Sequence, residues 1–199
     1  MSGERLRRSL DEHQAVAREL GGVLPAIEEL GEALRAALAG GGRVLAFGNG
    51  GSAAEAQHLA AELVGRAKAD RDPLPAVALV ADASSLTAIA NDYGFAEVFA
   101  RQVRALATRK DLVVGITTSG RSENVIRGLE AAHNVHAKTA LLTGTDGVRA
   151  AALADYAVVV PSSETARVQE MHVLVVHLLC EILDEWAVGL DQGARPPHA

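Results

Sequence analysis

A loop rich in hydroxyl groups follows one of the apolar runs of this sequence. It reads Thr117-Thr118-Ser119-Gly120-Arg121-Ser122-Glu123-Asn124 and leads into a stretch with helical periodicity over residues 123–132. Capping that helix needs a single hydroxyl, and the loop carries four, on Thr117, Thr118, Ser119 and Ser122. Hydroxyls and free backbone N–H groups at a helix N-terminus can bind a terminal phosphate without lysine, because the helix dipole favours an anion there. The loop therefore predicts a phosphate site.

A glycine-rich loop follows an earlier apolar run and reads Gly48-Asn49-Gly50-Gly51-Ser52. Glycines let the backbone approach a ligand closely, and Ser52 can cap the following helix while it offers donors to an anion. The loop lacks the Gly-Lys-Ser/Thr of a Walker loop and the third glycine of a dinucleotide-binding fingerprint. We expect a ligand here, and a plain tight turn with a helix cap is the alternative.

Candidate acid–base and metal-binding side chains lie on two expected helices. His58 and Glu62 are four residues apart and share one face of a helix expected over residues 52–66. Gln169 and His177 are eight residues apart on a later helix, so they are two turns along and about 80° around from one another. Imidazoles, a carboxylate and an amide oxygen are a plausible ligand set for zinc. A structural histidine and a surface carboxylate are the alternative interpretation.

The elements that must position these groups alternate between strands and helices. Apolar, β-branched runs typical of strands buried on both faces lie at residues 43–47, 76–80, 111–117, 138–143 and 156–161. Helical periodicity lies at residues 52–66, 84–90, 97–107, 123–132, 148–153 and from 165 to about 188. This alternation predicts an α/β fold with a doubly wound, five-stranded parallel sheet in flavodoxin-like order.

An amphipathic helical pair is expected before the first strand, over residues 5–38, with a turn at Gly21-Gly22 and Pro25. Such helices have no strand of their own to cover, which favours packing on a partner subunit; packing on their own domain is the alternative. We therefore expect one domain over residues 1–199, made of N-terminal helices for oligomerisation (1–39), an α/β core (43–188) and a flexible tail (189–199).

The composition restricts the class of ligand. The chain has 199 residues, a formal net charge of −6, 49% hydrophobic residues and 3% aromatic residues, which is typical of one globular domain. Its acidity and its few aromatic side chains argue against nucleic acid or an anionic membrane as a partner and favour a small ligand. No apolar stretch is long enough for a membrane span. The single cysteine, Cys180, and the absence of a leader-like apolar segment predict a cytoplasmic location.

Five segments together resemble the phosphoheptose isomerases of the sugar-isomerase (SIS) superfamily. They are FGNGGSAAEAQHLAAELVGR, IANDYGF, GITTSGRSEN, LLTGTDG and RVQEMHVLVVHLLCEILDE, and they cover nearly the whole chain in order. The TSG-x-S loop alone indicates only a sugar-phosphate-binding SIS domain. Its combination with GNGGS, a His-x-x-x-Glu pair, NDYGF and RVQEMH is far more specific.

This resemblance implies an enzyme that converts sedoheptulose 7-phosphate to an aldose heptose 7-phosphate of the manno series through an enediolate. It implies Glu62 as the base and His177 as the acid, in a homotetramer with active sites between subunits. It further implies one zinc ion per subunit bound by His58, Glu62, Gln169 and His177. The implied sugar-phosphate site consists of Asn49, Gly50, Gly51, Ser52, Glu62, Asn91, Asp92, Thr117, Thr118, Ser119, Ser122 and Gln169.

Two alternatives to this activity stay open. A related group keeps the SIS fold but binds a DNA-replication initiator protein, and the resemblance suggests that its members lack the acid–base groups. Both Glu62 and His177 are present here, which favours the enzyme. An isomerase for another sugar phosphate is the second alternative, since nothing in the loops counts substrate carbons.

Overall fold

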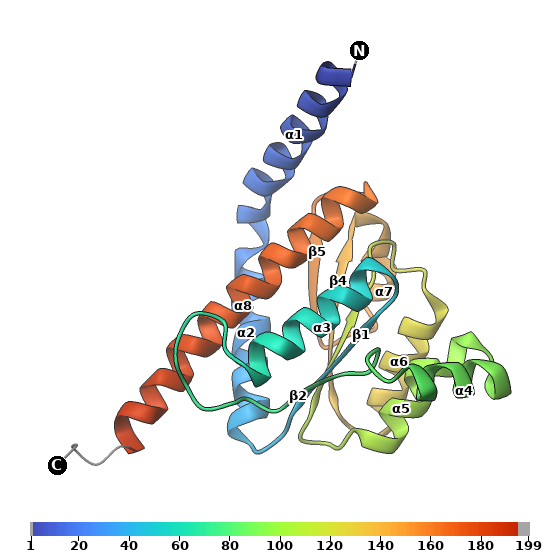
Figure 1. The fold of residues 1–199 in the computed structure, drawn as a ribbon, viewed down its shortest axis with the longest axis vertical. Helices are drawn as coiled ribbons and strands as arrows, with labels where there is room; N and C mark the ends of the chain where they lie inside the picture. Colours follow the sequence, from blue (N-terminus) through green and yellow to red (C-terminus); the bar gives the residue numbers. More distant parts are fainter. Residues whose placement is uncertain (1, 195–199) are drawn as a thin grey trace.

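Five parallel strands form the centre of the protein in the computed structural model, which describes residues 2–194 and the side chains of residues 3–189 (Figure 1). The strands are β1 (Val44–Gly48), β2 (Ala76–Ala78), β3 (Leu112–Ile116), β4 (Lys138–Gly144) and β5 (Tyr156–Val160). They lie in the order β2-β1-β3-β4-β5, and every neighbouring pair is parallel. The expected doubly wound, flavodoxin-like α/β fold is confirmed.

Both faces of the sheet are covered by helices, which explains why the strands read as continuous apolar runs. Alternate residues of a strand point to opposite faces. In β1, Val44 and Ala46 belong to one hydrophobic core, whereas Leu45 and Phe47 belong to the other. In β3 and β4 neighbouring residues likewise divide between the two cores. A strand with two buried faces is therefore mostly apolar, although β4 also buries Thr139 and Thr143.

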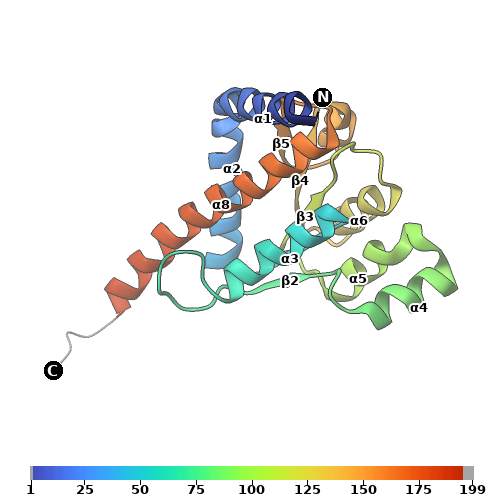
Figure 2. The same ribbon diagram turned by 45° about the horizontal axis from the view of Figure 1, so that its top comes forward.

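Each face of the sheet has its own set of helices. One core combines side chains of α2 (Leu24–Ala39), α3 (Gly51–Val64) and α8 (Thr165–Ala194). The other core lies under α5 (Val98–Leu106) and α6 (Glu123–Asn134). The shorter elements are α4 (Ala83–Tyr93), α7 (Val148–Ala151), η1 (Leu20–Val23), η2 (Phe95–Glu97) and η3 (Thr145–Gly147). Figures 1 and 2 show α3 and α8 side by side on the same face.

The N-terminal helical pair consists of α1 (Ser2–Glu19) and α2, joined by η1. The two helices have different surroundings. In α2, Ile27, Leu30 and Leu34 are almost fully buried in the core of their own domain. In contrast, α1 extends away from the sheet (Figure 1), and its Leu6 and Leu10 are 70% and 56% exposed. The alternative that these helices pack on their own domain is therefore correct for α2. Helix α1 contacts its own domain only in part: His13 pairs with Glu170 of α8 at 2.7 Å, while Leu6 and Leu10 stay exposed.

The last helix is longer than its sequence pattern indicated. We expected it to end near Val188 and a flexible tail to begin at Gly189, but α8 continues to Ala194. The expected tail is corrected for residues 189–194, and residues 195–199 lie outside the described part of the chain. None of the described helices combines the length and the apolar character that a bilayer span requires.

The packing of α6 on the sheet gives a test of the core. A Cβ atom added at Gly128 of α6 would lie 2.5 Å from Cζ of Phe47, whose ring stacks on Phe99 with centroids 4.8 Å apart. Gly128→Ala should therefore lower the free energy of unfolding by about 1–2 kcal/mol in urea titrations, because overpacking outweighs the gain in helix propensity. Gly189→Ala is the control, since that glycine of α8 has no atom within 4 Å of an added Cβ. This control should be neutral or stabilising, and an equally stable Gly128→Ala protein would contradict the prediction.

Candidate active site

The glycine-rich and hydroxyl-rich loops meet because β1 and β3 are neighbours in a parallel sheet. Gly48 at the end of β1 is paired with Ile116 at the end of β3, so the segments that follow start at the same edge. Strand β1 connects to β2 on one side, and β3 begins the progression to the other side. This change of direction is where ligands bind in open α/β sheets. The topology therefore places both predicted ligand loops together.

Two asparagines join these loops directly. Nδ2 of Asn49 donates to Oδ1 of Asn124 at 2.8 Å, and Nδ2 of Asn124 donates to Oδ1 of Asn49, also at 2.8 Å. Asn124 is 3% exposed, and its Oδ1 also accepts the backbone N–H of Val125. We had not included Asn124 among the site residues, although it ends the hydroxyl-rich segment. The reciprocal amide pair fixes the orientation of Asn49 at the mouth of the site.

The hydroxyl-rich loop leaves the N-terminus of α6 without a side-chain cap. Ser122 is the N-cap residue but makes no capping hydrogen bond, and its hydroxyl lies 3.2 Å from Oγ1 of Thr117. Gly120 has a φ of +64° and packs so closely on Gly147 that an added Cβ would lie 2.4 Å from its Cα. Uncapped N–H groups beside hydroxyls form a suitable site for an anion. This geometry agrees with the predicted phosphate site.

The glycine-rich loop differs in one respect from our expectation. Gly50, with a φ of +56°, is the N-cap of α3, and Ser52 lies inside the first turn and is 3% exposed. Ser52 therefore does not cap the helix. A Cβ added at Gly51 would lie 2.3 Å from Nε2 of Gln169, so the side chain of Gln169 reaches from α8 to the start of α3. The glycine at position 51 makes room for this amide.

Three of the four predicted metal-ligating residues lie together where α3 packs on α8. Nε2 of His58 is 3.2 Å from Oε1 of Glu62, and the rings of His58 and His177 are edge-to-face with centroids 4.9 Å apart. The side chains of His58 and Glu62 are 32% and 24% exposed, so they are accessible to a ligand. The His58 ring thus lies between the Glu62 carboxylate and the His177 imidazole, and carboxylates and imidazoles are groups that can act as general acids and bases.

Gln169 is not part of this group within one protomer. Its amide lies against Gly51, about two turns before His58 on α3. Within residues 2–194, no three His, Cys, Asp or Glu side chains are arranged as a metal-binding group. The structure thus brings together His58, Glu62 and His177 but leaves the fourth predicted ligand at the phosphate end of the site.

Asn91 and Asp92 also lie apart from the loops. Both are exposed at the end of α4, where Nδ2 of Asn91 donates to Oδ1 of Asp92 at 2.8 Å. Among the residues of α4, none is buried. The side chains expected to bind the sugar hydroxyls therefore do not converge with Asn49 or Glu62 in a single protomer.

A buried pair between α3 and α8 was missed by our sequence analysis. Oε2 of Glu55 lies 3.5 Å from Nδ1 of His172, and the two residues are 5% and 0% exposed. These two atoms and Nε2 of His172 have no hydrogen-bond partner among the described residues. The spacing could have indicated this contact. Glu55 lies four residues after Gly51 and His172 three after Gln169, so each is about one helical turn beyond a predicted site residue and on the same helix face.

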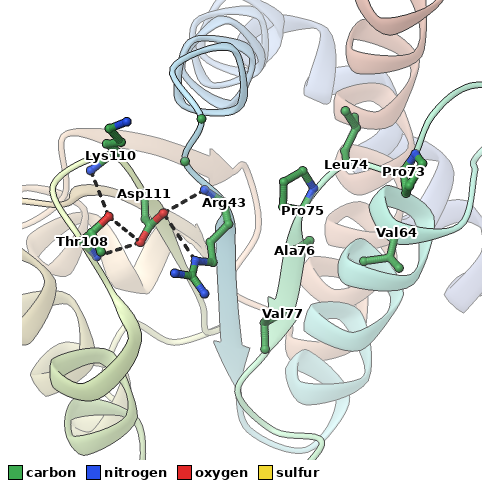
Figure 3. Close-up of a pocket in the computed structure, with 12 residues that line it drawn as sticks. Arg43, Val64, Pro73, Leu74, Pro75, Ala76, Val77, Thr108, Lys110 and Asp111 are labelled. Atoms are coloured by element: carbon green, nitrogen blue, oxygen red, sulfur yellow. Dashed lines mark hydrogen bonds and ion pairs between the residues drawn. The ribbon is translucent and has the colours of Figure 1, made fainter.

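A cavity of about 700 Å³ lies at the opposite, amino-terminal end of the strands (Figure 3). Its wall includes Pro75 and Lys110, together with a buried carboxylate, Asp111. Asp111 accepts the backbone N–H groups of Arg43 and Thr108 at 2.8 and 2.7 Å. This carboxylate is occupied by backbone donors, and none of the predicted site residues lines the cavity.

Cys180 on α8 gives a test of the environment next to Glu62. The thiol is 1% exposed, and burial, followed by the negative charge of Glu62, raises its pKa to about 12. Since the thiolate is the reactive form, a disulfide reagent at pH 8 should modify native protein at least about 100-fold more slowly than protein unfolded in urea. The thiol keeps its proton to a higher pH in the folded protein than in the unfolded protein. The free energy of unfolding should therefore fall as the pH rises beyond about 9. Equal reaction rates in the two states would contradict this placement.

The comparisons with known proteins identify the family. The SIS domain family matches residues 14–144. The phosphoheptose isomerase of Aquifex aeolicus is 58% identical over 149 residues, 75% of this chain and 78% of the relative. That of Geotalea daltonii is 47% identical over 187 residues, 94% of this chain and 97% of the relative.

Two solved structures have the same fold over nearly the whole chain. The phosphoheptose isomerase from Neisseria gonorrhoeae has a TM-score of 0.88 and 42% identity, covering 93% of this chain and 100% of its own. The phosphoheptose isomerase from Francisella tularensis has a TM-score of 0.90 and 38% identity, covering 93% and 99%. The resemblance drawn from the sequence motifs is thereby confirmed, and the chain belongs to the phosphoheptose isomerase family of SIS-domain enzymes.

Proposed function

We propose that this enzyme is a ketose–aldose isomerase that converts D-sedoheptulose 7-phosphate to D-glycero-D-manno-heptose 7-phosphate. The observation that carries the proposal is the group in which His58 contacts both the Glu62 carboxylate and the His177 ring, on a fold whose uncapped α6 N-terminus suits a phosphate. The relatives named phosphoheptose isomerase support the choice of substrate. The enzyme supplies a heptose precursor for biosynthesis and works in the cytoplasm, where the buried Cys180 thiol remains reduced.

The reaction moves a carbonyl group from C2 to C1 without any net change in composition. Glu62 takes a proton from C1 of the ketose, which produces a cis-enediolate, and returns a proton to C2. His177 removes the proton from the C1 hydroxyl and supplies one to the oxygen on C2. The two side chains come from different helices, so a substrate bound where α3 and α8 meet can contact both.

The substrate phosphate binds to the hydroxyls of Thr117, Thr118, Ser119 and Ser122 at the start of α6. Asn49, Gly50, Gly51, Ser52 and Gln169 line the adjoining edge. Asn91 and Asp92 bind sugar hydroxyls of a site in a neighbouring protomer, since both are exposed on α4 and bonded to one another. Amide and carboxylate groups are suited to polyol recognition because each offers several donors or acceptors.

The side chains at the contact between α3 and α8 suit zinc by type. Two imidazoles and a carboxylate, from His58, His177 and Glu62, would hold the ion, and Gln169 would complete the set as an oxygen ligand. Because the Gln169 amide lies against Gly51 here, a rotation of that side chain or a Gln169 from another protomer has to provide the fourth ligand. Bound zinc would supply Lewis-acid polarisation of a carbonyl oxygen.

The enzyme assembles as a homotetramer with its active sites between subunits. Two observations support this proposal: α1 presents Leu6 and Leu10 to solvent, and Asn91 and Asp92 lie apart from the remaining site residues. Apolar surface on a helix that projects from its domain is typical of an intersubunit contact. A non-catalytic SIS-domain regulator that binds a replication initiator is not favoured, because the relatives are isomerases and Glu62 and His177 are both present.

Turnover of sedoheptulose 7-phosphate is the direct test. Zinc-supplied protein should form the aldose and exchange solvent deuterium into C1 or C2. Glu62→Gln keeps the side-chain size but removes the proton acceptor, so kcat should fall by about 10²–10⁴-fold. Near-normal turnover of Glu62→Gln would assign the base to another group.

Absence of both turnover and exchange in the wild type would favour a regulator, and turnover of a different sugar phosphate would change only the substrate. Elemental analysis of His58→Ala protein in the same series should show loss of zinc.

The assembly is tested through α1, because α2 belongs to the core of its own domain. A Leu6→Glu/Leu10→Glu variant should form species smaller than the wild-type tetramer in light scattering and should lose activity, since charged side chains cannot be buried at an apolar contact. The thermal unfolding profile should still show a folded domain. A monomeric wild type at micromolar concentration would contradict the assembly outright, whereas an intact variant tetramer would assign the contact to other helices.

A further inference from the structure

A buried ion pair ties the segment between α3 and β2 to α8. The side chain of Arg71 is 0% exposed, and its Nε donates to Oδ1 of Asp184 at 2.6 Å. Oδ2 of Asp184 accepts the backbone N–H groups of Lys68 and Ala69, each at 2.9 Å. Figure 1 shows this segment passing beside α8 on its way from α3 to β2. The pair therefore connects a long loop to a helix that carries site residues.

The remaining donors of Arg71 hold the last turn of α3. Nη2 donates to the carbonyl oxygen of Glu62 at 2.9 Å, and Nη1 donates to that of Leu63 at 3.0 Å. Because α3 ends at Val64, these carbonyls are among the last of the helix and have no partner within it. A cation at this end also interacts favourably with the helix dipole. The guanidinium thus binds the backbone of the residue proposed as the catalytic base.

The other end of the ion pair lies on the stretch of α8 that carries His177. Asp184 follows His177 by seven residues, which is about two turns along the same side of the helix. Burial by itself would raise the pKa of Asp184, but the N–H groups of Ala69 and Lys68 and the Arg71 guanidinium outweigh burial and hold the pKa below its usual range. The Asp184 carboxylate is therefore charged at neutral pH and forms an ion pair with Arg71. Through Arg71, α8 is joined to the backbone of Glu62.

We propose that Arg71 and Asp184 are positioning residues that fix the Glu62 backbone on α3 relative to His177 on α8. This inference rests on the proposed roles of Glu62 and His177. A buried ion pair contributes little more to stability than a well-packed apolar pair would, because both charges lose their hydration. What an apolar pair cannot supply is a set of directed hydrogen bonds from one side chain to two carbonyls and a carboxylate. The pair sets the separation of the acid and the base.

The test compares two buried carboxylates of similar structural role. Asp111, like Asp184, is almost fully buried, accepts two backbone N–H groups and lies near an arginine, but those N–H groups belong to Arg43 and Thr108 and not to the segment that joins α3 to α8. Asp184→Asn and Asp111→Asn should lower the thermal unfolding temperature to a similar degree. Only Asp184→Asn should lower kcat, by about tenfold, because a displacement of about 1 Å at a catalytic group costs up to about 100-fold.

Arg71→Met should lower kcat by about 10- to 100-fold while KM changes by less than about threefold, since the phosphate loop lies at the opposite end of α3, about 20 Å away along the helix. Arg71→Lys restores the charge but not the forked geometry, so its kcat should lie between those of Arg71→Met and the wild type. Hydrogen exchange gives a readout independent of turnover. Amides of residues 58–65 should exchange at least about tenfold faster in Arg71→Met and Asp184→Asn than in the wild type. Their exchange rates should be unchanged in Asp111→Asn.

The outcomes separate this inference from the proposed function. Unchanged exchange and kcat in Arg71→Met and Asp184→Asn would overturn the positioning role, as would an equal loss of kcat in Asp111→Asn. If the exchange pattern is as expected but Glu62→Gln retains full turnover, the proposed catalytic role of Glu62 fails, and with it the claim that the pair positions the base. Faster exchange together with a selective loss of kcat would support the inference.

Discussion

The side-by-side packing of α3 and α8 is the contact on which the rest of the site depends. The facing pairs follow the same order along both helices: Gly51 meets Gln169, Glu55 meets His172, His58 meets His177, and the end of α3 is joined to Asp184 through Arg71. The two helices therefore run in the same direction. Each begins near the edge where the strands end, and each carries its polar side chains toward the other. Apolar residues on the remaining faces, such as Leu59, Leu63, Val176 and Leu179, bury this pair of helices against the sheet.

This arrangement places the predicted site residues in two groups, at different positions along the contact between α3 and α8. The glycine-rich loop and Gln169 lie at the start of α3, near the hydroxyl-rich loop, whereas Glu62 and His177 lie about two to three turns farther along α3 and α8. In the proposed tetramer, a neighbouring protomer would contribute part of the site across this separation. The exposed Asn91–Asp92 pair and the projecting α1 are the surfaces that this proposal uses. Assembly and catalysis would then depend on each other, because the surfaces that complete the site are also surfaces of contact.

The strands and helices were predictable because their signals are local. Residues 44–48 and 112–116 contain only apolar residues and glycine, since both faces of each strand are buried. The helix over residues 123–132 was expected with an error of only two residues at its end, Asn134. The end of α8 was placed too early because Gly189 is a poor helix former, although α8 continues through it. The separate surroundings of α1 and α2 could not be predicted, since both helices have the same apolar periodicity and only the sheet distinguishes them.

The sequence by itself determined the fold class and the family, and it singled out the two loops that the sheet brings together, because turn residues, periodicity and motif spacing are properties of neighbouring positions. It also indicated that His58 and Glu62 share a helical face, since four residues bring two side chains to one side. The tertiary structure decided which groups from distant segments meet. The Asn49–Asn124 amide pair, the buried Glu55–His172 pair and the Arg71–Asp184 ion pair join residues 75, 117 and 113 positions apart. No local pattern specifies such contacts, because the position of one helix on another depends on the packing of the whole hydrophobic core.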